Sequence, residues 1–170
     1  NFGAELEMTE VTGIKDLGDH KTVLTTNGEI ETKNVIIATG TKERLMNIPG
    51  EKEYTGKGVS YCAVCDGPFF KGKETAVIGG GNSAIEEAVY LAGFVSKVHI
   101  IVRRDVFRAD KYIIDKAKSM NNIVFHTLKK PLEVIGDGHK VTGLKLTDSK
   151  TNEESLLEVS GIFPFIGLDP

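Results

Sequence analysis

Two cysteines three residues apart, Cys62 and Cys65, are the residues of this chain best suited to chemistry. Thiols at C-x-x-C spacing can close a small disulfide and exchange it with the disulfide of another molecule. Asp66 follows directly, and a carboxylate beside reactive thiols suits proton transfer, although a turn or helix-cap role is the simpler alternative. We therefore expect a redox pair, with Asp66 as its proton-transfer companion.

The spacing of the other ligand-type residues disfavours a zinc site. Zinc usually takes four protein ligands, and none of the histidines falls within a few residues of the cysteines. They are His20, His99, His126 and His139. A secreted disulfide scaffold would use more cysteines at wider spacing. We expect no bound metal.

A glycine-rich loop begins about a dozen residues after the cysteines and fits the pattern G-x-G-x-x-A. It consists of Gly79, Gly80, Gly81, Asn82, Ser83 and Ala84. In this pattern the first glycine permits a tight turn, the second lets a pyrophosphate approach the backbone, and the small last residue lets helix and strand pack closely. Because the helix N-terminus that follows favours an anion, we expect a bound dinucleotide.

Arginines stand about twenty residues further on, where such a domain contacts the adenosine ribose. They are Arg103, Arg104 and Arg108. An NAD site usually has an acidic residue there, whereas arginines match a 2′-phosphate in geometry and charge. Asp105 complicates this interpretation, because its carboxylate could accept from a ribose hydroxyl or pair with a neighbouring arginine. The position in the fold favours NADPH.

Strands and helices of the right length surround these motifs. The apolar spacing predicts strands at 75–78, 97–102 and 123–126, with helices at 83–91 and 110–119. Together they make a βαβαβ half of a doubly wound, Rossmann-like α/β fold. A β hairpin turning at 136–138 is expected over 132–146.

The flanking sequence indicates further β structure. Asn27-Gly28 predicts a type I′ hairpin turn between strands at 22–26 and 29–32. Continuous apolar runs that end in small residues are typical of buried strands. The remaining expectations are a buried strand at 34–40, a linker marked by 48–50 and by glycines 56 and 58, and an apolar strand at 161–167 that nothing follows to cover.

Composition excludes several classes of protein. The net charge of -3 and the pI near 5.8 give no reason to expect nucleic-acid binding. No apolar run approaches the roughly 20 residues that cross a membrane, and the N-terminus lacks the features of a signal peptide. We expect a cytoplasmic protein. Because the chain opens at Asn1 without a methionine, we expect a piece of something longer.

These motifs together resemble the low-molecular-weight thioredoxin reductases. Residues 62–67, Cys-Ala-Val-Cys-Asp-Gly, resemble the family's C-A-x-C-D-G, and residues 77–84 resemble its nucleotide loop. The three arginines resemble its H-R-R-x-x-x-R element, although Val102 stands where the family usually has histidine. Residues 35–40 resemble the A-T-G strand of its FAD-binding domain.

The resemblance implies a discontinuous FAD-binding domain into which an NADPH-binding domain is inserted. It assigns residues 1–45 to part of the first, 46–159 to the second with its redox pair, and 160–170 to the start of the returning segment. Thr39 and Gly40 would belong to the flavin site, whose pyrophosphate loop this chain lacks. The family's domains rotate, and hinges are implied near 40–50 and 158–161.

The implied activity is that of a thioredoxin-disulfide reductase, which passes electrons from NADPH through FAD and the Cys62–Cys65 disulfide to thioredoxin. Cys62 would attack the substrate disulfide, Cys65 would face the flavin and Asp66 would supply or accept the proton. The longer protein would be a homodimer with FAD, and the fragment alone would lack flavin and activity.

Two alternatives stay open. The flavoprotein of the alkyl hydroperoxide reductase system has a similar core and a similar segment from Cys62 to Lys73, but it prefers NADH and lacks the arginine cluster. A non-catalytic nucleotide-binding module that senses redox state belongs to a different class. Flavin and NADPH-dependent disulfide reduction in the longer protein would separate the two classes.

Overall fold

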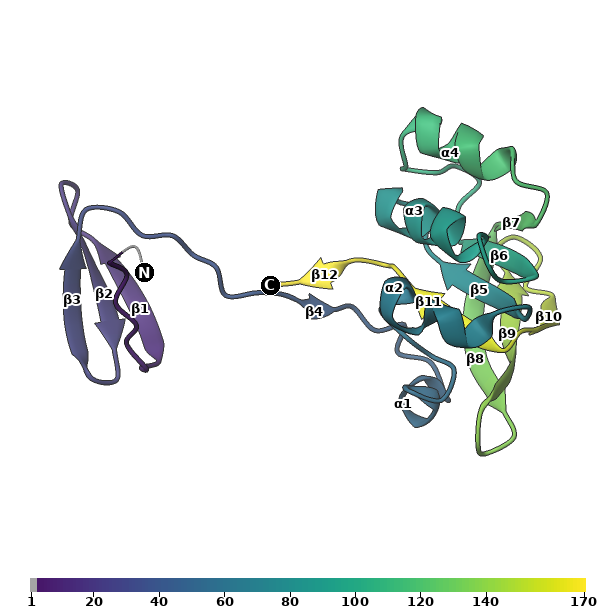
Figure 1. Ribbon diagram of the computed structural model, residues 1–170, viewed down its shortest axis with the longest axis horizontal. Helices are drawn as coiled ribbons and strands as arrows, with labels where there is room; N and C mark the ends of the chain where they lie inside the picture. The colour runs from purple at the N-terminus through teal and green to yellow at the C-terminus, as the bar shows by residue number, and fades with distance from the viewer. Residues whose placement is uncertain (1–2) are drawn as a thin grey trace. The chain divides into compact units, whose positions relative to one another are not determined.

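The computed structural model describes residues 3–170 and divides into two compact units, Asn1–Gly40 and Thr41–Pro170 (Figure 1). The described residues form one three-stranded sheet in the first unit, and a four-stranded, a three-stranded and a two-stranded sheet in the second. Its mixed α/β structure around a parallel sheet confirms the predicted fold class. No helix among the described residues is long and apolar enough to span a membrane.

The first unit is an antiparallel meander of β1 (Val11–Asp16), β2 (Lys21–Thr25) and β3 (Gly28–Thr32). The hairpin is confirmed, but the predicted type I′ turn is wrong. Thr25 pairs with Gly28, so the turn residues are Thr26 and Asn27, and neither has a positive φ. The Thr25 hydroxyl explains the shift, because it donates to the Gly28 carbonyl at 2.8 Å and accepts from the Asn27 N–H at 3.2 Å.

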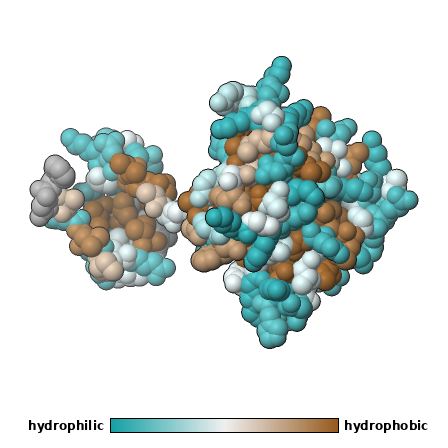
Figure 2. Space-filling model, turned by 45° about the vertical axis from the view of Figure 1, so that its right-hand side comes forward, coloured by the Kyte–Doolittle hydropathy of each residue, from teal (hydrophilic) through white to brown (hydrophobic). Residues whose placement is uncertain are grey.

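The strand predicted at 34–40 is absent from the described residues, which is a correction to the sequence prediction. The segment lies outside all four sheets, with Ile36 92% and Ile37 71% exposed. An apolar run forms a buried strand only where neighbouring strands supply hydrogen bonds and cover its faces. Apolar side chains also gather on the surface of the first unit (Figure 2), among them Leu6, Met8 and Ile30.

The second unit is built on a parallel sheet in the order β11, β5, β6, β7. Its strands are β5 (Glu74–Ile78), β6 (Lys97–Val102), β7 (Ile123–Thr127) and β11 (Gly161–Pro164). The three strands of the βαβαβ unit fall where the sequence predicted them. The expectation of an uncovered strand after 160 is wrong, because β11 pairs with β5 and Ile162 and Phe163 are fully buried.

Helices α3 (Asn82–Leu91) and α4 (Lys111–Lys118) pack on one face of this sheet (Figure 1). Alternate strand residues such as Val77, Val98 and Ile100 meet Ala84 and Leu91 of α3 in a buried cluster. Two short elements, α2 (Ala63–Asp66) and the 3₁₀ turn η1 (Gly67–Phe70), complete that side. The small side chains on α3 allow its axis to lie close to the strands.

The other face is covered by an antiparallel sheet of β8 (Lys129–Gly136), β9 (Val141–Asp148) and β10 (Glu154–Glu158). Ile78 and Ile101 from the parallel sheet pack there against Val134 and Leu144. The predicted hairpin is confirmed as β8 and β9. The third strand was not predicted from the sequence.

The segment predicted as a linker is packed against the hairpin. It contains α1 (Glu51–Tyr54), whose Glu51 is 1% exposed. That carboxylate accepts from the backbone N–H groups of Met46 at 2.8 Å and Asn47 at 2.7 Å. Nearby, β4 (Lys42–Glu43) pairs with β12 (Leu168–Asp169) in a short antiparallel ladder. The expected hinge at 158–161 stays a prediction, although Ser160 donates to the Glu74 carbonyl and Gly161 belongs to β11.

A hydrogen-bonded chain of side chains crosses the parallel sheet, from Glu74 at the start of β5 to His126 near the end of β7. Buried His99 lies 2.9 Å from Glu74 Oε2 through Nε2 and 2.9 Å from His126 Nε2 through Nδ1. Burial lowers the pKa of His126, and the charges of His99 and Lys129 lower it further. Neutral imidazoles can donate along this chain, whereas two protonated rings would lose the bond between them.

This arrangement predicts acid sensitivity of the second unit. A lowered pKa means that the unfolded chain binds the proton first, so the stabilisation is present above pH 6.5 and is lost as pH falls through the folded pKa. His126→Gln should therefore reduce the fall in calorimetric melting temperature between pH 7.5 and pH 5. His139→Gln, at an exposed turn, is the control. An equal fall in His126→Gln and the unaltered protein would contradict the prediction.

Candidate functional site

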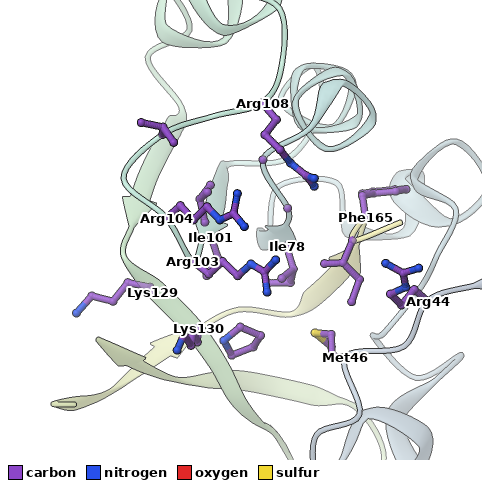
Figure 3. Close-up of a pocket in the computed structure, with 16 residues that line it drawn as sticks. Arg44, Met46, Ile78, Ile101, Arg103, Arg104, Arg108, Lys129, Lys130 and Phe165 are labelled. Carbon is purple, nitrogen blue, oxygen red and sulfur yellow. The ribbon is translucent and has the colours of Figure 1, made fainter. Parts of the chain in front are cut away.

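A cavity of about 470 Å³ opens at the carboxyl end of the parallel strands (Figure 3). The registers align Ile78, Val102, Thr127 and Pro164 near one edge of the sheet, so the connections that leave these strands converge. Such an edge is the usual ligand-binding position in an open α/β sheet.

Gly79, the first residue after β5, shapes the floor of the cavity. Its φ is 144°, a value that side-chain-bearing residues rarely adopt. A Cβ there would lie 2.4 Å from the Phe165 carbonyl oxygen and 2.9 Å from the Ala84 Cβ. Only glycine lets the end of β5, the first turn of α3 and the end of β11 meet this closely. This is the tight-turn role that the sequence assigned to it.

Gly80 holds the arginine-bearing loop. Its carbonyl accepts from the N–H groups of Arg108 at 2.8 Å and Ala109 at 3.1 Å. A Cβ on Gly80 would lie 2.9 Å from Val102 Cγ1 at the end of β6 and 3.7 Å from Phe107 Cδ1 in the loop that follows, so both pack on the glycine turn. The two motifs predicted separately from the sequence are therefore one hydrogen-bonded structure.

Gly81 differs from its two neighbours. Beyond the adjoining residues, a Cβ there would meet no atom of the described chain within 4 Å, and its extended backbone has a φ of -94°. The protein therefore does not require glycine at this position for its own packing. The open space lies at the N-terminus of α3, where the motif places a pyrophosphate.

The cavity lining is strongly basic. Among residues 3–170 it contains six cationic side chains and no acidic one. They are Arg44, Arg103, Arg104, Arg108, Lys129 and Lys130. Asp105 lies outside the lining, and among the described residues no acidic group lies within 4 Å of the guanidinium groups of Arg103, Arg104 and Arg108. This arrangement favours a polyanionic ligand.

The cysteines form a disulfide, with Cα atoms 5.3 Å apart. Cys62 is the N-cap of α2, and its Sγ accepts from the Cys65 N–H at 3.1 Å. Cys65 is exposed and Cys62 half-buried, with exposed apolar Val64 and Phe69 nearby in sequence. None of these residues lines the basic cavity.

Tyr61 ties the disulfide segment to α1. Its hydroxyl donates to Glu51 Oε1 at 2.8 Å, and burial, followed by the hydrogen bond to Glu51, raises its pKa. The same carboxylate holds Met46, which lines the cavity. The residue before Cys62 is therefore fixed through a buried hydrogen-bonded carboxylate.

The pyridine nucleotide-disulphide oxidoreductase family matches residues 2–170. The chain belongs to this family. Thioredoxin reductase of Helicobacter pylori is 45% identical over 169 residues, which are 99% of this chain and 54% of the relative. The crystal structure of Lactococcus lactis thioredoxin reductase, in its FR conformation, has 47% identity and a TM-score of 0.84, covering 95% of this chain and 54% of that one. The chain spans about half the length of these relatives.

A second kind of relative is also similar. An alkyl hydroperoxide reductase component from Pseudomonas putida is 47% identical over 153 residues, which are 90% of this chain and 29% of the relative. The matches confirm the resemblance to thioredoxin reductases. They also include the predicted alternative, a component of the alkyl hydroperoxide reductase system.

Within this family member, the cavity brings together only some of the predicted cofactor residues. It unites Gly79, Gly80, Arg103, Arg104 and Arg108. Gly81, Asn82, Ser83 and Ala84 begin α3 outside the lining. The Asn82 side chain exchanges two hydrogen bonds with Asp110, at 2.9 and 2.7 Å, and so positions the start of α4.

The predicted flavin residues, Thr39 and Gly40, are exposed at the end of the first unit. Sequence reasoning missed Arg44, Lys129 and Lys130. The two lysines follow β7, and the convergence of parallel strands would have pointed to them. Arg44 gave no such signal, because its place depends on the ladder between β4 and β12.

The contrast between two glycines yields a test. Gly79→Ala should destabilise the second unit by at least about 1–3 kcal/mol, because a methyl group there strains the backbone and meets the Phe165 carbonyl. Gly81→Ala should leave the calorimetric melting temperature nearly unchanged but weaken NADP⁺ binding about tenfold, because its methyl group enters the space for the pyrophosphate. Equal effects of the two variants on melting and on binding would contradict these roles.

Proposed function

We propose that this chain is the NADPH-binding part of a thioredoxin-disulfide reductase and carries its redox-active disulfide. The observation that carries the proposal is the acid-free basic cavity beside the glycine turn, in a unit that also presents an exposed disulfide. The thioredoxin reductase relatives support the same activity.

The residues of the cavity fit NADPH. The open space at Gly81, which adjoins the lining residue Gly80, suits a pyrophosphate, and Arg103, Arg104 and Arg108 suit the 2′-phosphate. The bound cofactor supplies a hydride. The role of the protein here is to hold the adenosine half by charge and to direct the rest of the dinucleotide along the glycine turn.

The disulfide is the electron acceptor in this proposal. Two electrons and two protons convert it into two thiols, and we assign the proton transfer to Asp66. The Cys62 thiolate then attacks the substrate disulfide and releases one substrate thiolate. Cys65 attacks the mixed disulfide, which restores the Cys62–Cys65 bond and releases the second thiolate. The choice of Cys62 as the attacking thiol rests on the family resemblance, because in the oxidised form Cys65 is the more exposed residue.

The longer protein would also hold FAD, which relays electrons between NADPH and the disulfide. We assign residues 1–45 to part of the FAD-binding domain and residues 46–159 to the NADPH-binding domain. The pairing of Gly161–Pro164 with β5 supports extending the NADPH-binding domain from residue 159 to Pro164, so that the returning FAD-domain segment starts after Pro164 instead of at residue 160. We assign Thr39 and Gly40, which lie outside the sheets, to the flavin site of the longer protein.

Thioredoxin is the partner that we propose. A bifunctional thioredoxin reductase/thioredoxin of Mycobacterium leprae, 45% identical over 170 residues, supports this choice. We further propose a homodimer and a cytoplasmic location for the longer protein, with no role for nucleic acid or membrane.

The alternative is the flavoprotein component of an alkyl hydroperoxide reductase system, which the Pseudomonas putida relative favours. The arginine cluster weighs against it, because three guanidinium groups without acidic partners among the described residues suit a 2′-phosphate that NADH lacks. Cofactor preference therefore separates the two functions. Flavin content and NADPH-dependent disulfide reduction by the longer protein would exclude a non-catalytic redox-sensing module.

Replacing both Arg103 and Arg104 by alanine should weaken NADPH much more than NADH. A lost charge-assisted contact costs about 1.5–3 kcal/mol, or roughly tenfold to a hundredfold in affinity. Lys116→Ala with Lys118→Ala removes the same charge from the exposed side of α4 and serves as the control. Calorimetric titration of both cofactors decides the matter. Equal losses for the two cofactors, or tighter NADH binding by the unaltered protein, would refute NADPH preference.

The 170-residue chain by itself should purify without flavin and should not oxidise NADPH in the presence of thioredoxin. Among residues 3–170, the glycine loop between β5 and α3 lines the cavity that we assign to NADPH. It would therefore not serve to bind the pyrophosphate of FAD. Absorbance near 450 nm and NADPH consumption give the readouts. Thiol titration, with two thiols appearing only after dithiothreitol, controls for damaged cysteines. Stoichiometric flavin or measurable turnover would overturn the proposed division into domains.

A further inference from the structure

Arg44 forms an ion pair that closes the short ladder between β4 and β12. Its Nε donates to Asp169 Oδ1 at 3.1 Å, and its Nη2 donates to the same oxygen. Its backbone N–H donates to the Gly167 carbonyl at 3.0 Å. Gly167 has a φ of 126°, and a Cβ there would lie 3.4 Å from Arg44 Nη1. The guanidinium group therefore lies across a glycine that leaves room for it.

The same side chain lines the basic cavity, on the opposite side from the arginine cluster. Figure 3 places Arg44 beside Phe165, with Arg103, Arg104 and Arg108 across the cavity. Gly79 and Gly80 also belong to the lining. A guanidinium has five N–H donors, and Asp169 takes donors from two nitrogens, which leaves Nη1 for a second acceptor.

These positions separate two anionic groups of a dinucleotide. The arginine cluster suits the 2′-phosphate of the adenosine half, and the glycine turn suits the pyrophosphate. On one side of the turn, Gly80 accepts a hydrogen bond from the Arg108 N–H. On the other side, Gly79 meets Phe165, and Arg44 is hydrogen-bonded to Gly167, two residues further along the chain. A phosphate at that end is the one nearer the nicotinamide half.

Asp169 opposes such a ligand. The hydrogen bond from Arg44 lowers the pKa of Asp169, so its carboxylate is ionised at neutral pH. Both side chains are about half exposed, at 53% and 55%, and an ion pair of this kind contributes little to stability. The carboxylate partly neutralises the guanidinium. Breaking the pair would cost the fold little stability.

We propose that Arg44 binds the nicotinamide-side phosphate of the dinucleotide and that Asp169 competes with this phosphate for it. The inference rests on the proposed function and adds a specificity-determining residue from outside the glycine and arginine motifs. A ligand that displaces Asp169 from Arg44 weakens the ion pair across the β4–β12 ladder. By linkage, the ion pair lowers the affinity for the ligand by the same free energy.

The proposal predicts that two variants change the affinity for NADP⁺ in opposite directions. In calorimetric titrations of the full 170-residue chain, Arg44→Gln should weaken NADP⁺ about tenfold, as expected for one charge-assisted contact. Asp169→Asn should tighten NADP⁺ about threefold, because the competing charge is gone. In the double variant, Asp169→Asn should add nothing, because no guanidinium remains to be released.

A shortened probe locates the phosphate. 2′,5′-ADP carries the adenosine-side groups but lacks the nicotinamide-side phosphate, so Arg44→Gln should change its affinity less than twofold. Lys42→Gln removes a positive charge from β4 outside the cavity lining and is the matched control. Circular dichroism confirms that each variant is folded.

Three results would overturn the inference. Asp169→Asn could weaken NADP⁺ as Arg44→Gln does, which would make the ion pair merely structural. Arg44→Gln could leave NADP⁺ unchanged, or could weaken 2′,5′-ADP equally. If the unaltered chain bound neither NADP⁺ nor 2′,5′-ADP, the proposed function would fail and this inference with it, whereas binding with unaltered responses in the variants refutes the inference alone.

Discussion

The close approach of Gly79 to the Phe165 carbonyl is the constraint on which the rest of the second unit depends. Gly79 donates to Ile101 at 3.1 Å, and Phe165 donates to Ile78 at 2.8 Å, so the ends of β5, β6 and β11 are hydrogen-bonded around one point. A side chain at Gly79 would push these ends apart. The absence of that side chain fixes the cavity floor and the direction in which α3 leaves the sheet.

The redox pair depends on a separate set of contacts. Cys62 caps α2, and the preceding Tyr61 is held by the buried carboxylate of Glu51. α2 packs with α3 in the same apolar cluster, but the cysteines lie outside the lining of the basic cavity. The proposed nucleotide site and the disulfide therefore share a core without sharing a pocket, which fits the relay that the proposed function places between them.

Local patterns predicted the features that depend on nearby residues. The glycine loop, the arginines and the strands of the βαβαβ unit lie where the sequence indicated, because tight turns and buried strands have short-range signatures. Features set by distant partners were missed. Residues 34–40 have the composition of a buried strand but no neighbouring strand among the described residues. In contrast, β10 is mostly exposed and becomes a strand through its pairing with β9. Arg44 lines the cavity because β4 pairs with β12, a strand far away in the sequence.

The charge of the cavity gives a reason why Val102, which replaces the family's usual histidine, would leave the proposed NADPH preference intact. Val102 is 5% exposed and packs on Gly80, so its side chain supports the turn. A dinucleotide with a 2′-phosphate carries about four negative charges, two of them on that phosphate. The lining offers six cations from three separate segments of the chain, without an acid among its described residues. Two of the six are paired with acids outside the lining, Arg44 with Asp169 and Lys129 with Asp148. Four cations remain for the ligand, and a dinucleotide with only two charges would leave two of them uncompensated.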